Sequence, residues 1–492
     1  MLNKITYSIC NFITTNNKPQ NRKMSVQAQT PRNIEVTNGD QLEDERWVIE
    51  SITNANAALP PTARIPLVPR MVRAAHDYEK HFFPKVVSIG PHHFGNYNLE
   101  LVEQLKPVFT MKLLSEKETL RSLYKKLGDP EMVKQLRSFY EENSTTMLSN
   151  KEFTKMMMQD SCFILYYIQY IFCGKPEDCP ELKSHQVVFV HQDLLLLENQ
   201  IPFKVLNEVI NLLKIDSSNK FKPFIYENIL SSGKLKRTWL ESILRIQKNQ
   251  TCREEPDLEL TGHNEPDHIL HLLHRTITKV EFRGGNLQSS YRCTFRNVNE
   301  LANVGVHFKP SNTKSLAHVK FSKRRWWSAN VELPPITVDD STKPMLLNLI
   351  AYEMCSCDAS DAWVTSYICL LDSLIDHLED VKALRKAGIL ENLLGGDNEA
   401  TKLFNEIGTD LVPNSFAYME AKMNIQKHYD SRKNTLISEL KHEYVKSPWA
   451  FLALLGGLIA LFLSAVQIWF SIWSPDSKCD ELCQILKKTH HL

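Results

Sequence analysis

The residues best suited to catalysis are two adjacent histidines, His92 and His93. Gly90 and Pro91 precede them and Gly95 follows, a combination that predicts a tight loop displaying both imidazoles. Paired histidines can bind a metal ion or act as a general base. The simpler alternative, which we favour, is that both are loop residues hydrogen-bonded to the backbone.

Three carboxylates are the candidate partners for such a base: Asp160, Asp193 and Glu198. Asp193 and Glu198 stand five positions apart, so a helix would place them on different faces, and they do not form a ready acid/base pair. We expect Glu198 and Asn199 instead to be buried and hydrogen-bonded, orienting the chain that follows. Convergence of His93, Asp193 and Glu198 on one open pocket would favour an enzyme, whereas burial or scatter would favour a structural role.

A second group of histidines recurs at every third position: His268, His271 and His274. This spacing places three imidazoles near one stripe of a helix, as on a surface that binds a transition metal. A structural metal site usually adds a cysteine or a carboxylate at ligand spacing. We therefore predict neither a metal nor a cofactor, and keep these three residues as the candidate ligands.

Composition and missing motifs exclude most specific reactions. The sequence has no GxGxxG, Walker A, GxSxG, HExxH or protein-kinase signature. Its eleven cysteines are irregularly spaced without a CxxC pair, which favours free thiols in a reducing compartment. The net charge of +1 provides no overall field for an acidic polymer, so we predict no nucleic-acid partner.

The segments that carry the candidate histidines and carboxylates have mainly helical patterns. Helical patterns cover Leu99–Leu114, Glu116–Leu127 and Pro130–Glu142, and Val86–Ile89 has the length of a short strand. The four consecutive leucines Leu194–Leu197 predict a helix buried nearly all round.

Short alternating runs in the second half predict a small antiparallel sheet. They are Gly305–Phe308, Leu316–Phe321 and Val331–Val338, and helices follow, among them Ile389–Leu394. The fold class is thus mainly α (α+β): a multi-helix body with a small antiparallel β-sheet. The cations and indoles of Lys323–Trp327 suit stacking on bases or, on a membrane-tethered body, contact with lipid headgroups. The simpler alternative, which we favour, is a solvent-exposed hairpin tip with partly buried tryptophans.

One stretch near the carboxyl end is apolar enough to span a membrane. No Asp, Glu, Lys, Arg or His occurs between Ser447 and Pro475. Trp449 and Trp469 stand about 30 Å apart along a helix, the separation of the two interfaces of a bilayer. Within the span the small residues Gly456, Ala460 and Ser464 recur every fourth position, a spacing that lets a partner helix approach closely.

The position of this span predicts how the protein meets the membrane. Only a short tail follows it, and the N-terminus lacks the continuous apolar run of a secretory signal. We therefore expect a tail-anchored, single-pass membrane protein whose bulk faces the cytosol, with lipid and other proteins as partners. Met24 is an alternative start of translation to Met1.

These changes of pattern divide the chain into six parts. They are a disordered segment (1–45), a helical part (46–213), a polar linker or insertion (214–275), a helical part with the small sheet (276–446), the transmembrane helix (447–475) and a short tail (476–492).

Several of these segments together resemble one known family. They are Ile65–Arg73, Val86–Gly95, Asp160–Leu165, Asp193–Phe203, Glu300–Phe308, Leu333–Glu353, Asp372–Leu394 and the terminal span. The chain resembles, from about Trp47 to Trp473, the land-plant family called domain of unknown function 247. The resemblance implies a mainly helical plant protein with one C-terminal membrane helix and no established reaction. Some grass relatives are implicated in pollen self-incompatibility, which implies recognition or signalling. Tyr166 departs from the acid that many relatives carry after the Cys-Phe-Ile-Leu run.

Two functions remain from different classes. The first is a membrane-anchored recognition or signalling protein that acts through protein contacts. The second is a membrane-tethered hydrolase of unrecognised type that uses His92 or His93 with Asp160, Asp193 or Glu198.

Overall fold

The computed structural model describes most of the chain between residue 63 and residue 489. Its described residues are 46–50, 63–75, 77–172, 181–215, 221, 223–226, 265–279, 296–313, 315–325, 328–356, 361–431, 448–473 and 478–489. Contacts divide the chain into Met1–Pro61, of which only the helical residues 46–50 are described, and Thr62–Leu492. The segment predicted to be disordered (1–45) lies outside the described residues, as does the choice between Met1 and Met24.

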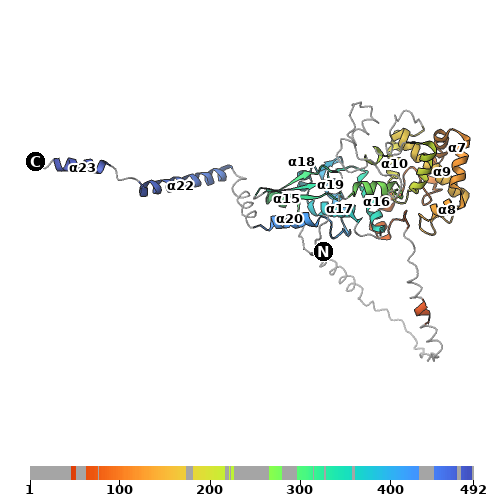
Figure 1. Ribbon diagram of the computed structural model, residues 1–492, viewed down its shortest axis with the longest axis horizontal. Coiled ribbons are helices and arrows are strands. Elements are labelled where there is room, and N and C mark those ends of the chain that lie inside the picture. The colour runs from red at the N-terminus through yellow and green to blue at the C-terminus, as the bar shows by residue number, and fades with distance from the viewer. Residues whose placement is uncertain are drawn as a thin grey trace, which may run out of the picture. The chain divides into compact units, whose positions relative to one another are not determined.

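The first half of the body is a set of helices around α9. The elements in order are α3 (Arg70–Ala75), α4 (Tyr78–His81), η1 (Tyr97–Leu99), α5 (Glu100–Glu103), α6 (Lys106–Leu114), α7 (Lys117–Leu127), α8 (Pro130–Arg137), α9 (Asn150–Tyr166), η2 (Tyr167–Phe172), α10 (Ser184–Asp193), α11 (Phe203–Leu213) and α14 (Ile269–Ile277). Helix α9 packs against α6, α7 and α11, and nearly all of its side chains after the first turn are buried (Figure 1). Its start is set by a capping box, in which Ser149 and Glu152 each accept a hydrogen bond from the backbone of the other.

The second half adds strands and further helices. These are α15 (Val298–Asn303), β1 (Val306–Pro310), β2 (Lys320–Arg325), β3 (Ser328–Leu333), β4 (Ile336–Val338), α16 (Thr342–Cys355), α17 (Trp363–Leu374), α18 (Leu378–Lys386), β5 (Leu390–Asn392), α19 (Asp397–Ile407), α20 (Met419–Tyr429), α22 (Pro448–Trp473) and α23 (Lys478–Thr489). The predicted fold class, mainly helical with a small sheet component, is confirmed.

The prediction of an antiparallel sheet is wrong in one respect. Strand β3 is central, with β2 antiparallel on one side and β1 parallel on the other. The chain leaves β1, forms the far edge as β2 and returns as β3, so β1 and β3 run in the same direction. A second pair, β4 and β5, is also parallel.

Two local predictions also fail because tertiary contacts override a short pattern. Residues Ile389–Leu394, predicted as a helix, contain strand β5, whose backbone pairs with β4. Residues Val86–Ile89, predicted as a strand, form no ladder. Their amide groups bond instead to buried side chains described below.

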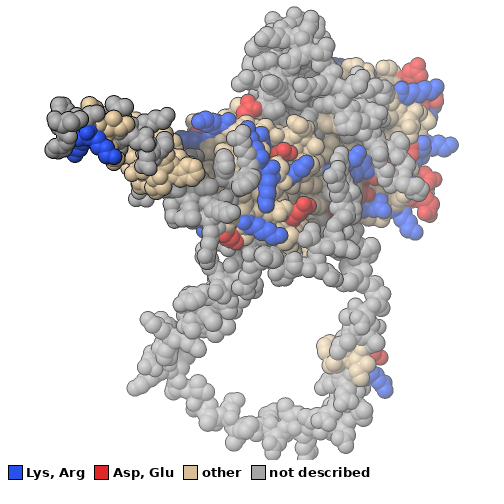
Figure 2. Space-filling model, turned by 60° about the vertical axis from the view of Figure 1, so that its left-hand side comes forward, with Lys and Arg blue, Asp and Glu red and all other residues tan. Residues whose placement is uncertain are grey.

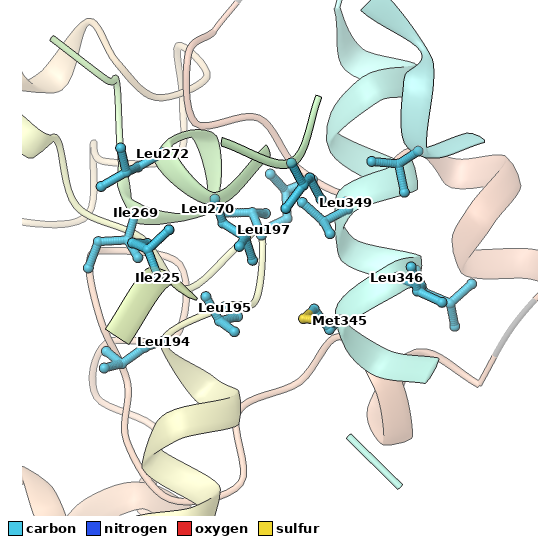
Figure 3. Packing of buried hydrophobic residues seen from close by; sticks show 14 of the residues in the cluster. Leu194, Leu195, Leu197, Ile225, Ile269, Leu270, Leu272, Met345, Leu346 and Leu349 are labelled. Atoms are coloured by element: carbon cyan, nitrogen blue, oxygen red, sulfur yellow. The ribbon is translucent and has the colours of Figure 1, made fainter. Parts of the chain in front are cut away.

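One hydrophobic core joins the two halves, and three leucines of the connector between α10 and α11, Leu194, Leu195 and Leu197, lie in it (Figure 3). Figure 3 shows Leu195 and Leu197 between α14 and Met345 and Leu349 of α16, and Leu194 below Ile225. These leucines are buried, as expected, but residues 194–202 form turns rather than the predicted helix.

Many of the described residues in the range predicted as a linker or insertion (214–275) are buried. Phe221, Phe224 and Ile225 are core residues, and so are Ile269–Leu273 except for His271, which is half-buried. Residues 227–264, the bulk of that range, lie outside the described part of the chain.

Helix α22 differs from every other long helix described here. It carries no charged residue, forms a tan surface without blue or red in Figure 2, and its described side chains are exposed apart from one intermediate position. Among the described residues, one helix is long and apolar enough to cross a membrane, and it is this one, over Leu452–Trp473 with a mean hydropathy of 2.1.

Candidate functional site

The carboxylate of Glu198 is the centre of a buried polar network. Its side chain is 2% exposed and accepts a hydrogen bond from the backbone amide of Val68 at 2.8 Å. The guanidinium of Arg73 and the hydroxyl of Tyr78 donate to the same carboxylate. Burial, followed by the bond to Glu198, raises the pKa of Tyr78 well above its ordinary range, so this hydroxyl remains a donor.

The segment that supplies these donors runs extended across the body before α3. The prolines Pro66 and Pro69 restrict its backbone and keep the residues that precede them out of the helical region. Ile65 forms an isolated parallel bridge to Tyr140, and the Leu67 amide donates to Glu141 at 3.1 Å. Glu198 therefore fastens one end of this segment to the connector between α10 and α11.

The histidine loop is folded against this network instead of displaying both imidazoles. His93 is 7% exposed, its ring meets the Phe83 ring edge-on at 4.8 Å, and its Nε2 lies 3.9 Å from Glu198 Oε2. His92 is half-buried against Tyr140. Burial lowers the pKa of His93 to about 4 and lowers the pKa of His92 as well, so both rings are neutral at pH 7.

The glycine before this loop is required by a close approach of two backbones. Gly90 has φ of +77°, and a Cβ atom there would stand 2.4 Å from the carbonyl oxygen of Gln200. Any larger residue would push the histidine loop away from the connector. The Gly-Pro pair in the sequence predicted a turn at this position. Nothing in the sequence indicated that the turn would pack against the backbone of Gln200.

Asp193 holds the segment before the loop through its backbone. Its two carboxylate oxygens accept from the amides of Lys85, Val86 and Val87 at 2.8–3.0 Å. Burial raises the pKa of Asp193 to about 7, against these three amide bonds, which lower it. Its carboxylate replaces the partner strand that Val86–Ile89 would otherwise need.

Asn199 and Gln200 satisfy the backbone of the irregular connector. Asn199 accepts from the Ile89 amide at 2.6 Å and donates to the carbonyls of Val87 and Asp193. Gln200 donates to the carbonyls of Leu194 and Leu196, both at 2.8 Å. These bonds explain why the leucine run is not helical, because side chains supply the partners that helical amides would otherwise provide.

A buried lysine, which the sequence analysis missed, completes the polar core. Lys106 is 2% exposed and lies 2.7 Å from Asp160 and 2.6 Å from Glu103. Its ammonium also donates to the Ser88 carbonyl at 2.6 Å, and Asp160 accepts from the Gly90 amide at 2.8 Å. The only sequence signal was a lysine on the apolar face of a helix, which does not reveal its partner.

Comparison with known proteins places this chain in a family. The model of a plant protein family of unknown function, DUF247, matches residues 65–463, well over half of the 492-residue chain. The chain is a DUF247 protein. The resemblance noted in the sequence is therefore confirmed.

This DUF247 protein is similar to two Arabidopsis thaliana proteins. A UPF0481 protein is 27% identical over 419 residues, which cover 80% of this chain and 83% of the relative. A putative UPF0481 protein is 23% identical over 529 residues, which cover 89% of this chain and 97% of the relative. No solved structure gives a significant match.

The second histidine group of the DUF247 chain surrounds an aromatic ring. His268, His271 and His274 each lie 5.3–5.8 Å from the ring of Tyr352, centroid to centroid. His274 Nε2 lies 2.8 Å from Glu353 Oε1, and that carboxylate also accepts from the amides of residues 364 and 365. Burial lowers the pKa of His268 to about 3.

These three imidazoles therefore have separate partners instead of one shared centre. His268 accepts from the His271 amide as the cap of α14, and His271 accepts from the Asp267 amide. Among the described residues, no group of three His, Cys, Asp or Glu is arranged to hold a metal ion.

The candidate acid/base residues are brought together only in part. His93 and Glu198 are neighbours, but no hydrogen bond or ion pair joins Asp193 to either of them among the described residues. The carboxylates of Glu198 and Asp193 are both occupied by donors from the chain itself. These side chains hold three backbone segments together: the extended segment before α3, residues 85–90 and the connector between α10 and α11. We call Asp193, Glu198, Asn199, Gln200 and their hydrogen-bond partners the polar clasp.

Proposed function

We propose that this DUF247 protein is a single-pass, membrane-anchored protein that acts in recognition or signalling through contacts of its body with other proteins. The body faces the cytosol, and membrane lipid surrounds the C-terminal anchor. The observation that carries the proposal is the exposed apolar helix α22.

The energetics of α22 support insertion into lipid. Its 26 residues include no charge, and large apolar side chains such as Leu461, Phe462 and Ile472 are 68–72% exposed. Each Leu, Ile, Phe or Val favours the bilayer centre by about 0.3–0.6 kcal/mol, and their sum exceeds the cost of Gln467 and Ser464. Water would leave this surface unburied, whereas a bilayer removes it from water.

One face of the anchor suits a partner helix. Gly456, Ala460 and Ser464 follow one another at four-residue spacing, and the Ser464 hydroxyl donates to its own Ala460 carbonyl at 2.9 Å. Apart from the neighbouring backbone of its own helix, no described atom lies within 4 Å of the place that a Cβ atom on Gly456 would take. A second helix can therefore approach this stripe without meeting a polar group that needs a partner.

The polar clasp favours contact-based function over the alternative hydrolase. A general base must reach substrate, and a nucleophilic carboxylate must have a free oxygen. Glu198 and Asp193 are 2% and 1% exposed, and each is bound by three donors of the chain. We therefore assign these residues to folding of the recognition body.

Fractionation of the full-length protein from plant tissue tests the anchor. We expect it in the membrane fraction after alkaline carbonate washing and in solution only with detergent. Replacing Leu458 and Leu461 with Arg should move it to the soluble fraction, because each Arg at the centre of a span costs about 2.5–3.5 kcal/mol. Leu486→Arg in α23 is the matched control and should leave the protein in the membrane.

A soluble wild-type protein would overturn the proposed anchor. The recognition part is tested by proximity labelling from a tag on the N-terminal side of the body. We expect a set of labelled proteins that a tagged fragment of residues 447–492 does not label. Identical sets from both would contradict a role for the body in recognition.

A further inference from the structure

The edge strand β2 is strongly basic. Its sequence, Lys320 to Arg325, has four cations among six residues and no acid. Lys320 and Arg324 are exposed, and neither forms an ion pair with a described carboxylate. We call these two residues the basic edge. Lys323 is also exposed, but it is paired with the buried Ala329 and so lies on the side of the strand that faces α20.

The sheet places a further lysine on the same face as the start of this edge. Lys320 of β2 is paired with Glu332 of β3, which is paired in turn with Lys309 of β1. Partners across a ladder point to the same side of a sheet, so this row reads Lys-Glu-Lys. One acid among these cations leaves the outer face of the sheet with a positive charge.

The register also explains why the basic edge stays in solvent. Phe321 is partnered by Val331, which is 1% exposed, so the alternate residues of β2 point toward the core. The Phe321 ring meets the His428 ring of α20 at 6.1 Å. Helix α20 covers the inner side of the strand and leaves Lys320 and Arg324 outside.

Chain connectivity limits how far this edge can lie from the membrane anchor. Helix α20 packs against β2, and the next described element after it is the anchor α22. Residues 430–447 separate the two, a length that reaches at most about 60 Å when fully extended.

We propose that the basic edge, with Lys309, binds anionic lipid headgroups of the membrane that holds α22, and so orients the body on that membrane. This inference rests on the proposed membrane anchor. The bilayer surface is the occupant that charge complementarity and tethering favour, because tethering keeps the edge at a high local concentration of headgroups. Each Lys or Arg near an anionic surface favours contact by about fivefold, so three of them give about 100-fold.

Lysine reactivity in lipid nanodiscs tests this contact with the full-length chain. The protein is reconstituted in phosphatidylcholine alone and in phosphatidylcholine with phosphatidylserine, and exposed lysines are acetylated and quantified by mass spectrometry. We expect Lys309 and Lys320 to react several-fold more slowly in the anionic discs. Lys125 and Lys151, exposed on α7 and α9, serve as internal controls and should react equally in both.

High ionic strength should remove the difference, since salt screens exposed charges. A double variant, K320Q/R324Q, should release Lys309, which then reacts equally in both discs; K125Q/K134Q has the same charge change on distant helices and should not. A protein that enters the discs but in which Lys309 and Lys320 each react equally in the two kinds of disc would overturn the lipid contact alone. A protein that does not enter the discs would overturn the anchor itself. Equal slowing of Lys125 and Lys320 would also contradict the inference, because it would show a nonspecific effect of charge.

Discussion

Polar side chains usually lie on the surface of a protein and apolar side chains inside it. The connector between α10 and α11 and the helix α22 both depart from this distribution, the first by burying polar side chains and the second by exposing apolar ones. The connector, residues 194–202, places Glu198, Asn199 and Gln200 inside the body at 0–2% exposure. Helix α22 leaves leucine, isoleucine and phenylalanine outside it. A buried polar side chain is stable only with hydrogen-bond partners, and an exposed apolar helix is stable only where another surface or a membrane removes it from water.

The difference lies in where the compensating partner is found. The polar side chains of the connector bond to backbone groups and to Arg73 and Tyr78 within the same chain. The apolar side chains of α22 have no such burial among the described residues. The connector is therefore part of folding, whereas α22 predicts an environment outside the chain.

The variant that replaces Leu458 and Leu461 of α22 with Arg should separate the two regions most clearly. It should change the distribution between membrane and solution by several kcal/mol and leave the urea unfolding of the body unchanged. Circular dichroism and urea titration in detergent check the second half of this expectation. A matching loss of body stability would contradict the separation of the two regions.

The reciprocal change is Glu198→Gln. It leaves the Arg73 guanidinium without a charged partner and weakens two further bonds, so we expect a loss of about 3 kcal/mol in the free energy of unfolding. The membrane fraction should not change. Glu141→Gln, at an exposed position that accepts one backbone amide, is the control and should cost less than about 1 kcal/mol.

The pH dependence of folding stability is a third test of the polar clasp, because His93 lies beside Glu198. Burial keeps the pKa of this ring at about 4, whereas the unfolded chain has the ordinary value of 6.5. Between these pH values the unfolded chain binds the proton and the folded chain does not, so folding loses stability as the pH falls from 6.5 to 4.

The variant His93→Gln does not titrate in this range. The free energy of unfolding of the wild type, relative to this variant, should fall by on the order of 3 kcal/mol across the window. Groups that titrate in both proteins, among them Asp160 and Asp193, cancel in this difference. A difference between the two proteins that stays constant with pH would contradict a buried, neutral His93.

The smallest expected effect concerns a polar side chain near solvent. Asn297 caps α15 by accepting a hydrogen bond from the Glu300 amide at 2.8 Å. Asn297→Ala should cost about 1 kcal/mol in urea unfolding, because water can replace the lost partner. A cost equal to that of Glu198→Gln would show that burial does not set the strength of the clasp.

Local sequence predicted the features that depend on neighbours along the chain. The charge-free run before Pro475 predicted α22, and helical periodicity predicted the mainly helical body. The family was also identified from short runs of residues and is confirmed. Burial of the four leucines followed from their residue type, and burial of Glu198 and Asn199 was expected from their place directly after the leucine run.

Long-range partners decided the rest. Asn199 and Gln200 bond to carbonyls of the leucine run and so prevent the helix that its pattern favoured. Lys106 meets Asp160 only when α6 packs on α9, and β5 becomes a strand only beside β4. Hydrophobic periodicity is a property of one segment, whereas a buried hydrogen bond or a strand ladder requires two, and only the folded chain brings the second one into place.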